Sequence, residues 1–140
     1  MIGAVLAKRM TRSAFDTINQ HKLAESVAGF AEDASWTFPG NTPISGVAEG
    51  KKAVEAAMTI WFERFPKINF TIKEIFISNI FAMGATNNIA VEWDIVEVDR
   101  EGKEFSNSGV TTIRVKSGKV VDMKDYLFDA DNLNKAWGKH

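Results

Sequence analysis

Two carboxylates lie close together in a strand-like run of the second half of the chain. Glu92 and Asp94 are separated by one residue, in a segment where apolar residues such as Trp93 and Ile95 alternate with polar ones. Because successive side chains of a β-strand point to opposite faces, Glu92 and Asp94 share one face and the apolar residues share the other. A third carboxylate, Asp125, lies in a later strand-like run.

Carboxylates that share an apolar cavity can act as an acid/base pair. If Asp125 points into the same cavity as Asp94, repulsion and desolvation raise the pKa of at least one carboxyl, so that an acid and a base coexist at one pH. Such a pair can transfer a proton on a hydrophobic substrate. The alternative interpretation is that Asp94, Asp125 and Glu92 are solvated at a cavity mouth or hydrogen-bonded to the backbone.

Other kinds of catalytic residue are scarce in this sequence. It has no cysteine, which excludes disulfides, thiol nucleophiles and thiolate metal sites. The only histidines, His21 and His140, are far apart in the chain and predict no metal site. The glycine-rich phosphate loop, the dinucleotide fingerprint and the nucleophile elbow are also missing. We therefore expect chemistry that uses no cofactor and no metal.

Aromatic residues of the first half are candidates for the lining of a substrate pocket. Trp36 is the strongest of them, and Phe38, Phe15 and Phe62 are the others that we expect to bind substrate. The alternative is that these rings only fill the core, as aromatic residues at helical spacing usually do.

Apolar periodicity predicts three helices in the first half and strands in the second. The expected helices reach residue 19, then cover 23–30 and about 54–65, with a short strand at 35–38 and a loop at 41–50. Strands are expected at 68–77, with a β-bulge at Lys73-Glu74, and at 88–96, 105–115 and 119–128, before a terminal helical turn at 131–137. Residues 79–87 can prolong a strand or form an irregular excursion.

Helices that precede hairpin-connected strands favour an α+β fold, in which N-terminal helices pack on a curved, mainly antiparallel sheet that encloses an apolar pocket. The 140 residues, 45% of them hydrophobic, suit one domain spanning residues 1–140. A net charge of -1 from 17 basic and 18 acidic residues predicts no nucleic-acid partner and no binding to a membrane surface. We find no signal peptide and no apolar run long enough for a membrane helix, and expect a cytoplasmic protein.

Four stretches, taken in their order and spacing, resemble the SnoaL-like family of the nuclear transport factor 2-like superfold, and the likeness covers nearly the whole chain. They are Gly29-Phe30-Ala31-Glu32-Asp33-Ala34, Gly46-Val47-Ala48-Glu49-Gly50-Lys51-Lys52-Ala53-Val54, Val91-Glu92-Trp93-Asp94 and Gly118-Lys119-Val120-Val121-Asp122-Met123-Lys124-Asp125-Tyr126. The resemblance implies a cone-shaped domain. It says little about activity, because the superfold includes isomerases, cyclases, hydrolases and non-enzymes.

The resemblance assigns roles to individual positions. Ketosteroid isomerases place their base, a tyrosine and an acid at positions held here by Phe38, Ala14 and Thr111. Phe38 cannot accept a proton, which excludes that mechanism, and Thr111 is left as an expected substrate contact.

Limonene epoxide hydrolases resemble the chain more closely. Their two aspartates match Asp94 and Asp125, and Asp125 also matches the acid/base position of SnoaL-type polyketide cyclases. Glu92 occupies the position of the hydrolase arginine, and Trp36 and Phe38 replace a tyrosine and an asparagine, so we do not carry epoxide hydrolysis over. The likeness makes the face of Glu92 and Asp94 the pocket face.

The opposite face, with Val91, Trp93 and Ile95, is then apolar, and no helix remains to cover it. We expect a homodimer formed through the sheet to bury this face, as the family resemblance also implies. The alternative is a locally covered face on a monomer.

Three functions are compatible with these residues. The first is a cofactor-independent isomerase, cyclase, dehydratase or hydrolase of a small apolar molecule, with Asp125 and Asp94 as the acid/base pair. The second is a non-catalytic binder of an apolar small molecule, indicated by Phe38 and Glu92 at positions where related enzymes keep polar machinery. The third is a protein-interaction module, which would need an exposed apolar groove beyond the dimer face.

Overall fold

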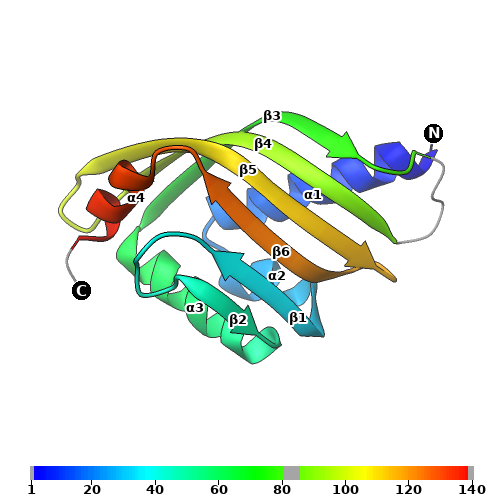
Figure 1. Ribbon diagram of the computed structural model, residues 1–140, viewed down its shortest axis with the longest axis horizontal. Helices are drawn as coiled ribbons and strands as arrows, with labels where there is room; N and C mark the ends of the chain where they lie inside the picture. Colours follow the sequence, from blue (N-terminus) through cyan, green and yellow to red (C-terminus); the bar gives the residue numbers. More distant parts are fainter. Residues whose placement is uncertain (1, 81–85, 139–140) are drawn as a thin grey trace.

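A six-stranded sheet in the order β2-β1-β6-β5-β4-β3 forms the centre of the computed structural model, which describes residues 2–80 and 86–138 (Figure 1). Strands β1 and β6 run parallel, and the other neighbours are antiparallel. The elements are α1 (Ile2–Asn19), α2 (Leu23–Ala28), β1 (Phe30–Phe38), β2 (Gly46–Glu49), α3 (Lys51–Arg64), β3 (Lys67–Ile77), β4 (Asn87–Val98), β5 (Glu104–Lys116), β6 (Lys119–Leu127) and α4 (Ala130–Trp137). The expected α+β fold with a mainly antiparallel sheet is confirmed.

The first three helices cover one face of the sheet (Figure 1). Helix α1 packs on β3, and α3 packs on β1. The side chain of Asn19, at the end of α1, fixes the helix to β3, because its amide donates to the carbonyl of Phe70 at 3.0 Å and its oxygen accepts from the Phe70 N–H at 2.7 Å. These hydrogen bonds satisfy backbone groups that an edge strand would otherwise leave unpaired.

The long strands follow the two-residue period of the sequence. The pairing of β3 with β4 shifts between Ile72 and Glu74, which confirms the expected β-bulge. A bulge places two residues opposite one, so Ile75 and Ile77 can point to the same side as Ile72 despite their opposite parity.

Two details of the first half differ from the sequence-based expectation. Strand β1 begins at Phe30, where we expected the end of a helix, because Phe30 pairs with Val120 of β6. Strand β2 lies within the expected loop and pairs with the end of β1. It is a four-residue edge strand with no buried side chain, so it has no alternating apolar pattern to predict it from. Residues 79–87, for which the sequence left two conformations possible, follow the end of β3 at Ile77 and reach Asn87, the first residue of β4. Of these, 81–85 are outside the described residues.

Aromatic rings fill the space between the helices and the sheet. Trp61 of α3 lies at the centre of this cluster, with ring centroids 5.9 Å from Trp36, 5.7 Å from Phe62 and 6.0 Å from Phe70. Phe70 in turn meets Trp93 edge-on at 5.0 Å. Large rigid rings in contact from α3, β1, β3 and β4 leave little free volume at this end of the sheet.

Helix α4 closes the end of the molecule near the β4–β5 hairpin (Figure 1). Asp129 caps its N-terminus by accepting from the Asn132 N–H. Trp137 packs edge-on against Phe65 with ring centroids 5.3 Å apart.

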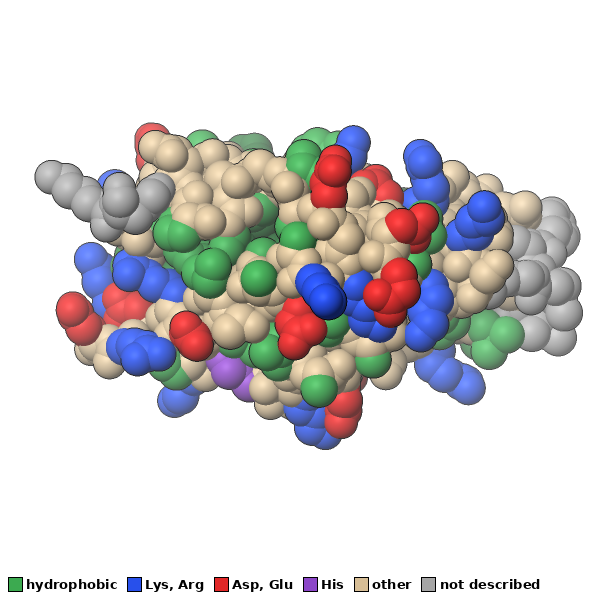
Figure 2. Space-filling model, turned by 90° about the horizontal axis from the view of Figure 1, so that it is seen from below, with side chains coloured by type: hydrophobic (Ala, Val, Ile, Leu, Met, Phe, Trp, Pro, Cys, Tyr) green, Lys and Arg blue, Asp and Glu red, His purple; other side chains and the backbone are tan. Residues whose placement is uncertain are grey.

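Acidic and basic side chains are interspersed on the face of the molecule that is seen from below (Figure 2). Within residues 2–80 and 86–138, no helix combines the length and the hydropathy that a membrane crossing requires.

Candidate functional site

The interior face of β4 is its apolar face. Val91, Trp93 and Ile95 are buried, whereas Glu92 and Asp94 are exposed. The expectation that these two acids line the pocket is therefore wrong. The helices cover the apolar face instead. The error is explained by the alignment, because an alignment that is off by one residue in a strand exchanges the two faces of that strand.

The surroundings of Asp94 and Glu92 on the outer face are polar. Asp94 lies 3.9 Å from the Lys73 ammonium, and both side chains are half exposed. Glu92 pairs across the strands with Glu74. The face with Val91 and Trp93 is already buried within the single chain, which supports the alternative of a locally covered face. The expected homodimer itself stays a prediction.

Asp125 of β6 points into the interior, as expected. Its Oδ2 accepts a hydrogen bond from the indole Nε1 of Trp36 at 2.7 Å, and its Oδ1 accepts from the Thr111 hydroxyl at 2.5 Å. Trp36 comes from β1 and Thr111 from β5, the two strands on either side of β6. The residue as a whole is partly buried, but its carboxyl group is held between two buried side chains.

A third side chain fixes the direction of the hydrogen bond from Thr111. The Thr111 oxygen accepts from the indole Nε1 of Trp93 at 2.8 Å. An indole N–H can only donate, so it occupies an acceptor position of Thr111 and leaves the hydroxyl proton free for Asp125. Both oxygens of Asp125 therefore face donors, an arrangement that suits its ionised form.

Two opposing effects set the protonation of Asp125. Burial raises the pKa of its carboxyl from 3.8 to about 6, while the hydrogen bonds from Thr111 and Trp36 lower it. Desolvation is the larger effect, because a charged group loses more hydration free energy on burial than a neutral one. The carboxyl can thus gain and lose a proton within a unit or so of neutral pH.

Glu97 of β4 is a second interior carboxyl that the sequence analysis missed. It is only 7% exposed, and its Oε2 accepts from the indole Nε1 of Trp61 at 2.6 Å. Burial raises its pKa from 4.5 to about 7, against the lowering effect of the Trp61 hydrogen bond. The signal was present, because Glu97 continues the parity of Trp93 and Ile95.

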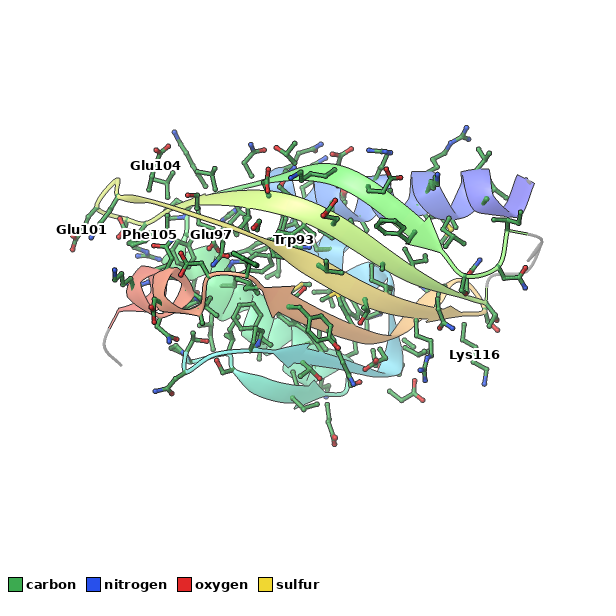
Figure 3. The ribbon with its side chains drawn as sticks, turned by 45° about the horizontal axis from the view of Figure 1, so that its top comes forward. Trp93, Glu97, Glu101, Glu104, Phe105 and Lys116 are labelled. Atoms are coloured by element: carbon green, nitrogen blue, oxygen red, sulfur yellow. The ribbon has the colours of Figure 1, made fainter. Side chains whose placement is uncertain are left out.

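Glu97 lies on β4 toward the β4–β5 hairpin that carries Glu101, whereas Lys116 marks the opposite end of β5 (Figure 3). Trp93 lies between these ends on β4 (Figure 3).

Glu97 and Asp125 border one small cavity of about 20 Å³, which we call the inner void. This volume is close to that of a single water molecule. The described residues that line it are Phe38, Trp61, Phe70, Trp93, Ile95, Glu97, Asp125 and Leu127.

The aromatic residues expected to bind substrate have different surroundings. Trp36 donates to Asp125, and Phe38 lines the inner void. Phe15 is buried and meets Phe70 edge-on at 5.0 Å. Phe62 stacks on the ring of His21, with centroids 4.4 Å apart.

A larger cavity lies between α1 and the sheet, near the turn between β5 and β6. We call it the α1 pocket; its volume is about 240 Å³. Its described lining includes none of the residues that we expected to contact substrate. It is formed by Gly3, Leu6, Ala7, Met10, Thr11, Ala14, Gly29, Asn87, Ile89, Ile113, Val115, Gly118 and Val120.

The side chains that could ligate a metal are dispersed in the described parts of the chain. In the part of the chain that the structure describes, no three His, Asp or Glu side chains gather around a common point. His21 is engaged elsewhere, with its Nε2 3.1 Å from the Phe62 carbonyl oxygen.

Comparison with known families identifies one match. The family model of the SnoaL-like domain matches residues 11–123. No curated protein sequence matches the chain.

Solved structures share the fold at low sequence identity. A nuclear transport factor 2-like protein of unknown function from Burkholderia pseudomallei has 18% identity and a TM-score of 0.79, with 94% of this chain and 97% of that chain covered. A Mycobacterium tuberculosis protein in complex with estradiol-17beta-hemisuccinate has 23% identity and a TM-score of 0.72, with 86% and 92% covered. TerC, co-crystallised with polyporic acid, has 12% identity and a TM-score of 0.69, with 82% and 85% covered.

Proposed function

The chain belongs to the SnoaL-like family, and on that premise we propose that it is a cofactor-independent enzyme that transfers a proton on a small apolar molecule. Asp125 is the acid/base group of this proposal. The observation that carries it is the environment of the Asp125 carboxyl, which is held inside the fold by Trp36 and Thr111 with its pKa raised by burial to about 6. Perturbed carboxyls inside a cavity-bearing fold are typical of catalytic sites.

The hydrogen bonds define which part of the reaction Asp125 performs. Because both oxygens accept from protein donors, the ionised form is the resting form at pH 7, and Asp125 begins as a base. Each carboxylate oxygen has a second lone pair, so one remains available to take a proton from a substrate carbon or from an attacking water. The protonated carboxyl then returns the proton in an isomerisation, cyclisation, dehydration or hydrolysis.

Glu97 replaces Asp94 as the second titrating group of the proposal. Its pKa of about 7 leaves it partly protonated at the pH where Asp125 is mostly ionised. Two carboxyls with separated pKa values provide an acid and a base at one pH. Both border the inner void.

Similar structures support a small molecule as the substrate. The Mycobacterium tuberculosis protein was solved with estradiol-17beta-hemisuccinate and TerC with polyporic acid. Both ligands are organic molecules with ring systems, and each binds to a protein of the same fold.

The test is turnover of neutral apolar ketones, lactones and epoxides by the wild-type protein and by Asp125→Asn. The carboxamide keeps the shape and an acceptor oxygen but cannot act as the base, so we expect a loss of kcat/KM of about 100-fold or more. Glu104→Gln, an exposed change on β5, is the control and should keep wild-type turnover. Equal turnover by Asp125→Asn and wild type would exclude Asp125 as the acid/base group.

A specific observation favours a second function, binding without turnover. Asp125 already has a protein partner on each oxygen, and the inner void has room for little more than a water molecule. In this case Asp125 and Trp36 are structural partners, and the chain would bind an apolar molecule unchanged. Retained ligand after prolonged incubation, with no product by mass spectrometry, would support this function over catalysis.

A further inference from the structure

The α1 pocket has a lining with almost no polar character. None of the described residues that line it is ionisable, and only Thr11 and Asn87 carry polar side chains. The Thr11 hydroxyl donates to the Ala7 carbonyl within the helix at 2.7 Å, so it makes a hydrogen bond with no ligand present. A charged ligand would lose its hydration in this pocket without gaining a partner.

Apolar side chains at the edge of the α1 pocket are exposed. Leu6 is 45% exposed and Met10 is 50% exposed, and both line the pocket. Large apolar side chains around a concave surface are typical of ligand sites, because a ligand removes them from water. Burying this area gives a favourable free energy to a ligand that is itself apolar.

The pocket is also limited in length. Along α1 its lining runs from Gly3 to Ala14, at helical steps, and the next inward position is Phe15. The ring of Phe15 is buried against Phe70 and is not among the described residues that line the pocket. The volume of about 240 Å³ is below the range of about 300 to 1,000 Å³ usual for drug-sized ligands.

The floor of the α1 pocket leads toward Asp125. Ile113 of the floor and Thr111, which donates to Asp125, are consecutive inward positions of β5, because side chains two residues apart share a face. Thr111 pairs directly with Asp125 across the strands. Ile113 is therefore the diagonal neighbour of Asp125, at a typical separation of about 7 Å.

We infer that the α1 pocket binds an uncharged, largely apolar molecule smaller than a steroid, placed so that its one polar group faces Asp125. The size and charge limits rest on the lining of the pocket alone. The direction toward Asp125 rests on the proposed function.

The size and charge limits are tested with three neutral probes, toluene, 1-methylnaphthalene and estradiol, and with benzoate as the charged counterpart of toluene. Binding is followed by methyl NMR, in which Leu6, Ile89, Ile113 and Val115 report on the pocket. We expect saturable shifts at these methyl groups with toluene and 1-methylnaphthalene. Benzoate and estradiol should bind at least tenfold more weakly. Equal binding of benzoate or estradiol, or shifts confined to other methyl groups, would overturn the inference.

Two variants locate the probe independently of its chemistry. Ala7→Leu adds volume inside the pocket, and Ala14→Leu adds it at the exposed edge, where misfolding is less of a risk. Each should weaken toluene binding at least tenfold. Ala24→Leu makes the same change at an exposed position of α2 and should leave binding unchanged. Wild-type affinity in Ala14→Leu, with circular dichroism unchanged, would contradict the assignment.

Asp125→Asn separates this inference from the proposed function. The variant should bind toluene as the wild type does, because Asp125 is not among the residues that line the α1 pocket. Retained binding with lost turnover supports both. Retained binding with unchanged turnover refutes the proposed function and leaves the pocket assignment standing, whereas absent binding in wild type and variant refutes the pocket assignment.

Discussion

Replacing Glu97 by glutamine should change the pH dependence of stability in a defined direction. Burial raises the pKa of Glu97 from 4.5 to about 7 in the folded protein. Between these values the folded chain keeps a proton that the unfolded chain has released. Unfolding therefore releases a proton, and a rising pH favours the unfolded state. The stability from this group is fully present below pH 4.5 and is lost by about pH 7.

The size of the effect follows from the pKa. A raise from 4.5 to about 7 corresponds to about 3 kcal/mol of unfolding free energy. The glutamine side chain of the variant can still accept the hydrogen bond from the Trp61 indole but does not titrate. Its buried amide N–H₂ costs about 1 to 3 kcal/mol if no acceptor is available. The variant should thus be less stable than wild type near pH 4.5 and more stable, or equal, at pH 8.

Urea denaturation followed by circular dichroism at pH 4.5 and pH 8 measures this difference, provided that the dependence on urea is the same in both proteins. Wild type should lose about 3 kcal/mol more than Glu97→Gln between the two pH values. Glu92→Gln changes an exposed acid on the outer face of the same strand and should follow wild type. Parallel pH profiles for wild type and Glu97→Gln would refute the account of Glu97 as a buried acid.

Further predictions concern the hydrogen bonds of Asp125. Thr111→Val removes a hydrogen-bond donor to Asp125, so the pKa of Asp125 should rise above about 6 in carbon-detected NMR titrations. The variant also removes the acceptor of the Trp93 indole N–H, which should cost about 1 to 3 kcal/mol of unfolding free energy in urea denaturation. Thr111→Ser keeps the hydroxyl and should show neither effect, and equal pKa values in all three proteins would contradict the assigned hydrogen bond. Trp36→Phe should also raise the pKa of Asp125, because the ring can no longer donate, and an unchanged titration would show that this bond is absent in solution. If Asp125 is the base, kcat/KM should fall below a pH of about 6 as the carboxyl is protonated, and a profile that is flat from pH 5 to 8 would exclude this role.

The periodicity of the sequence predicts the architecture well. The helical steps before Asn19 and the alternation in the long strands both follow from burial of one face. The parity change after Ile72 even located the bulge of β3. The four-residue β2 escaped prediction because its pairing with β1 comes from tertiary contacts that leave no apolar pattern.

The site was predicted only in part. Asp125 and its neighbour Trp36 were identified, and the structure joins them by a hydrogen bond. Glu92 and Asp94 were assigned to the interior from a distant resemblance, although the apolar residues beside them already indicated the opposite. In a half-buried strand, the apolar face is the better guide to the interior than an alignment, because one residue of misregister exchanges the faces.

Glu97 and the α1 pocket illustrate two further limits. Glu97 could have been found as the one acid with the parity of the buried residues of β4. The α1 pocket could not, because a cavity depends on how side chains from α1 and from three strands fill the space between them. The aromatic residues that were expected to line a substrate pocket instead pack against other rings of the fold or border the inner void.

The central claim is that Asp125 acts on a bound small molecule. Its most direct test is a crystal structure of Asp125→Asn with a bound neutral ketone of about the size of 1-methylnaphthalene. The account predicts the apolar rings in the α1 pocket and the ligand carbonyl within hydrogen-bond reach of the carboxamide that replaces the Asp125 carboxyl, at about 3 Å. A ligand bound elsewhere, or bound in the α1 pocket with its carbonyl turned to solvent, would contradict the assignment of Asp125 as the group that acts on the substrate.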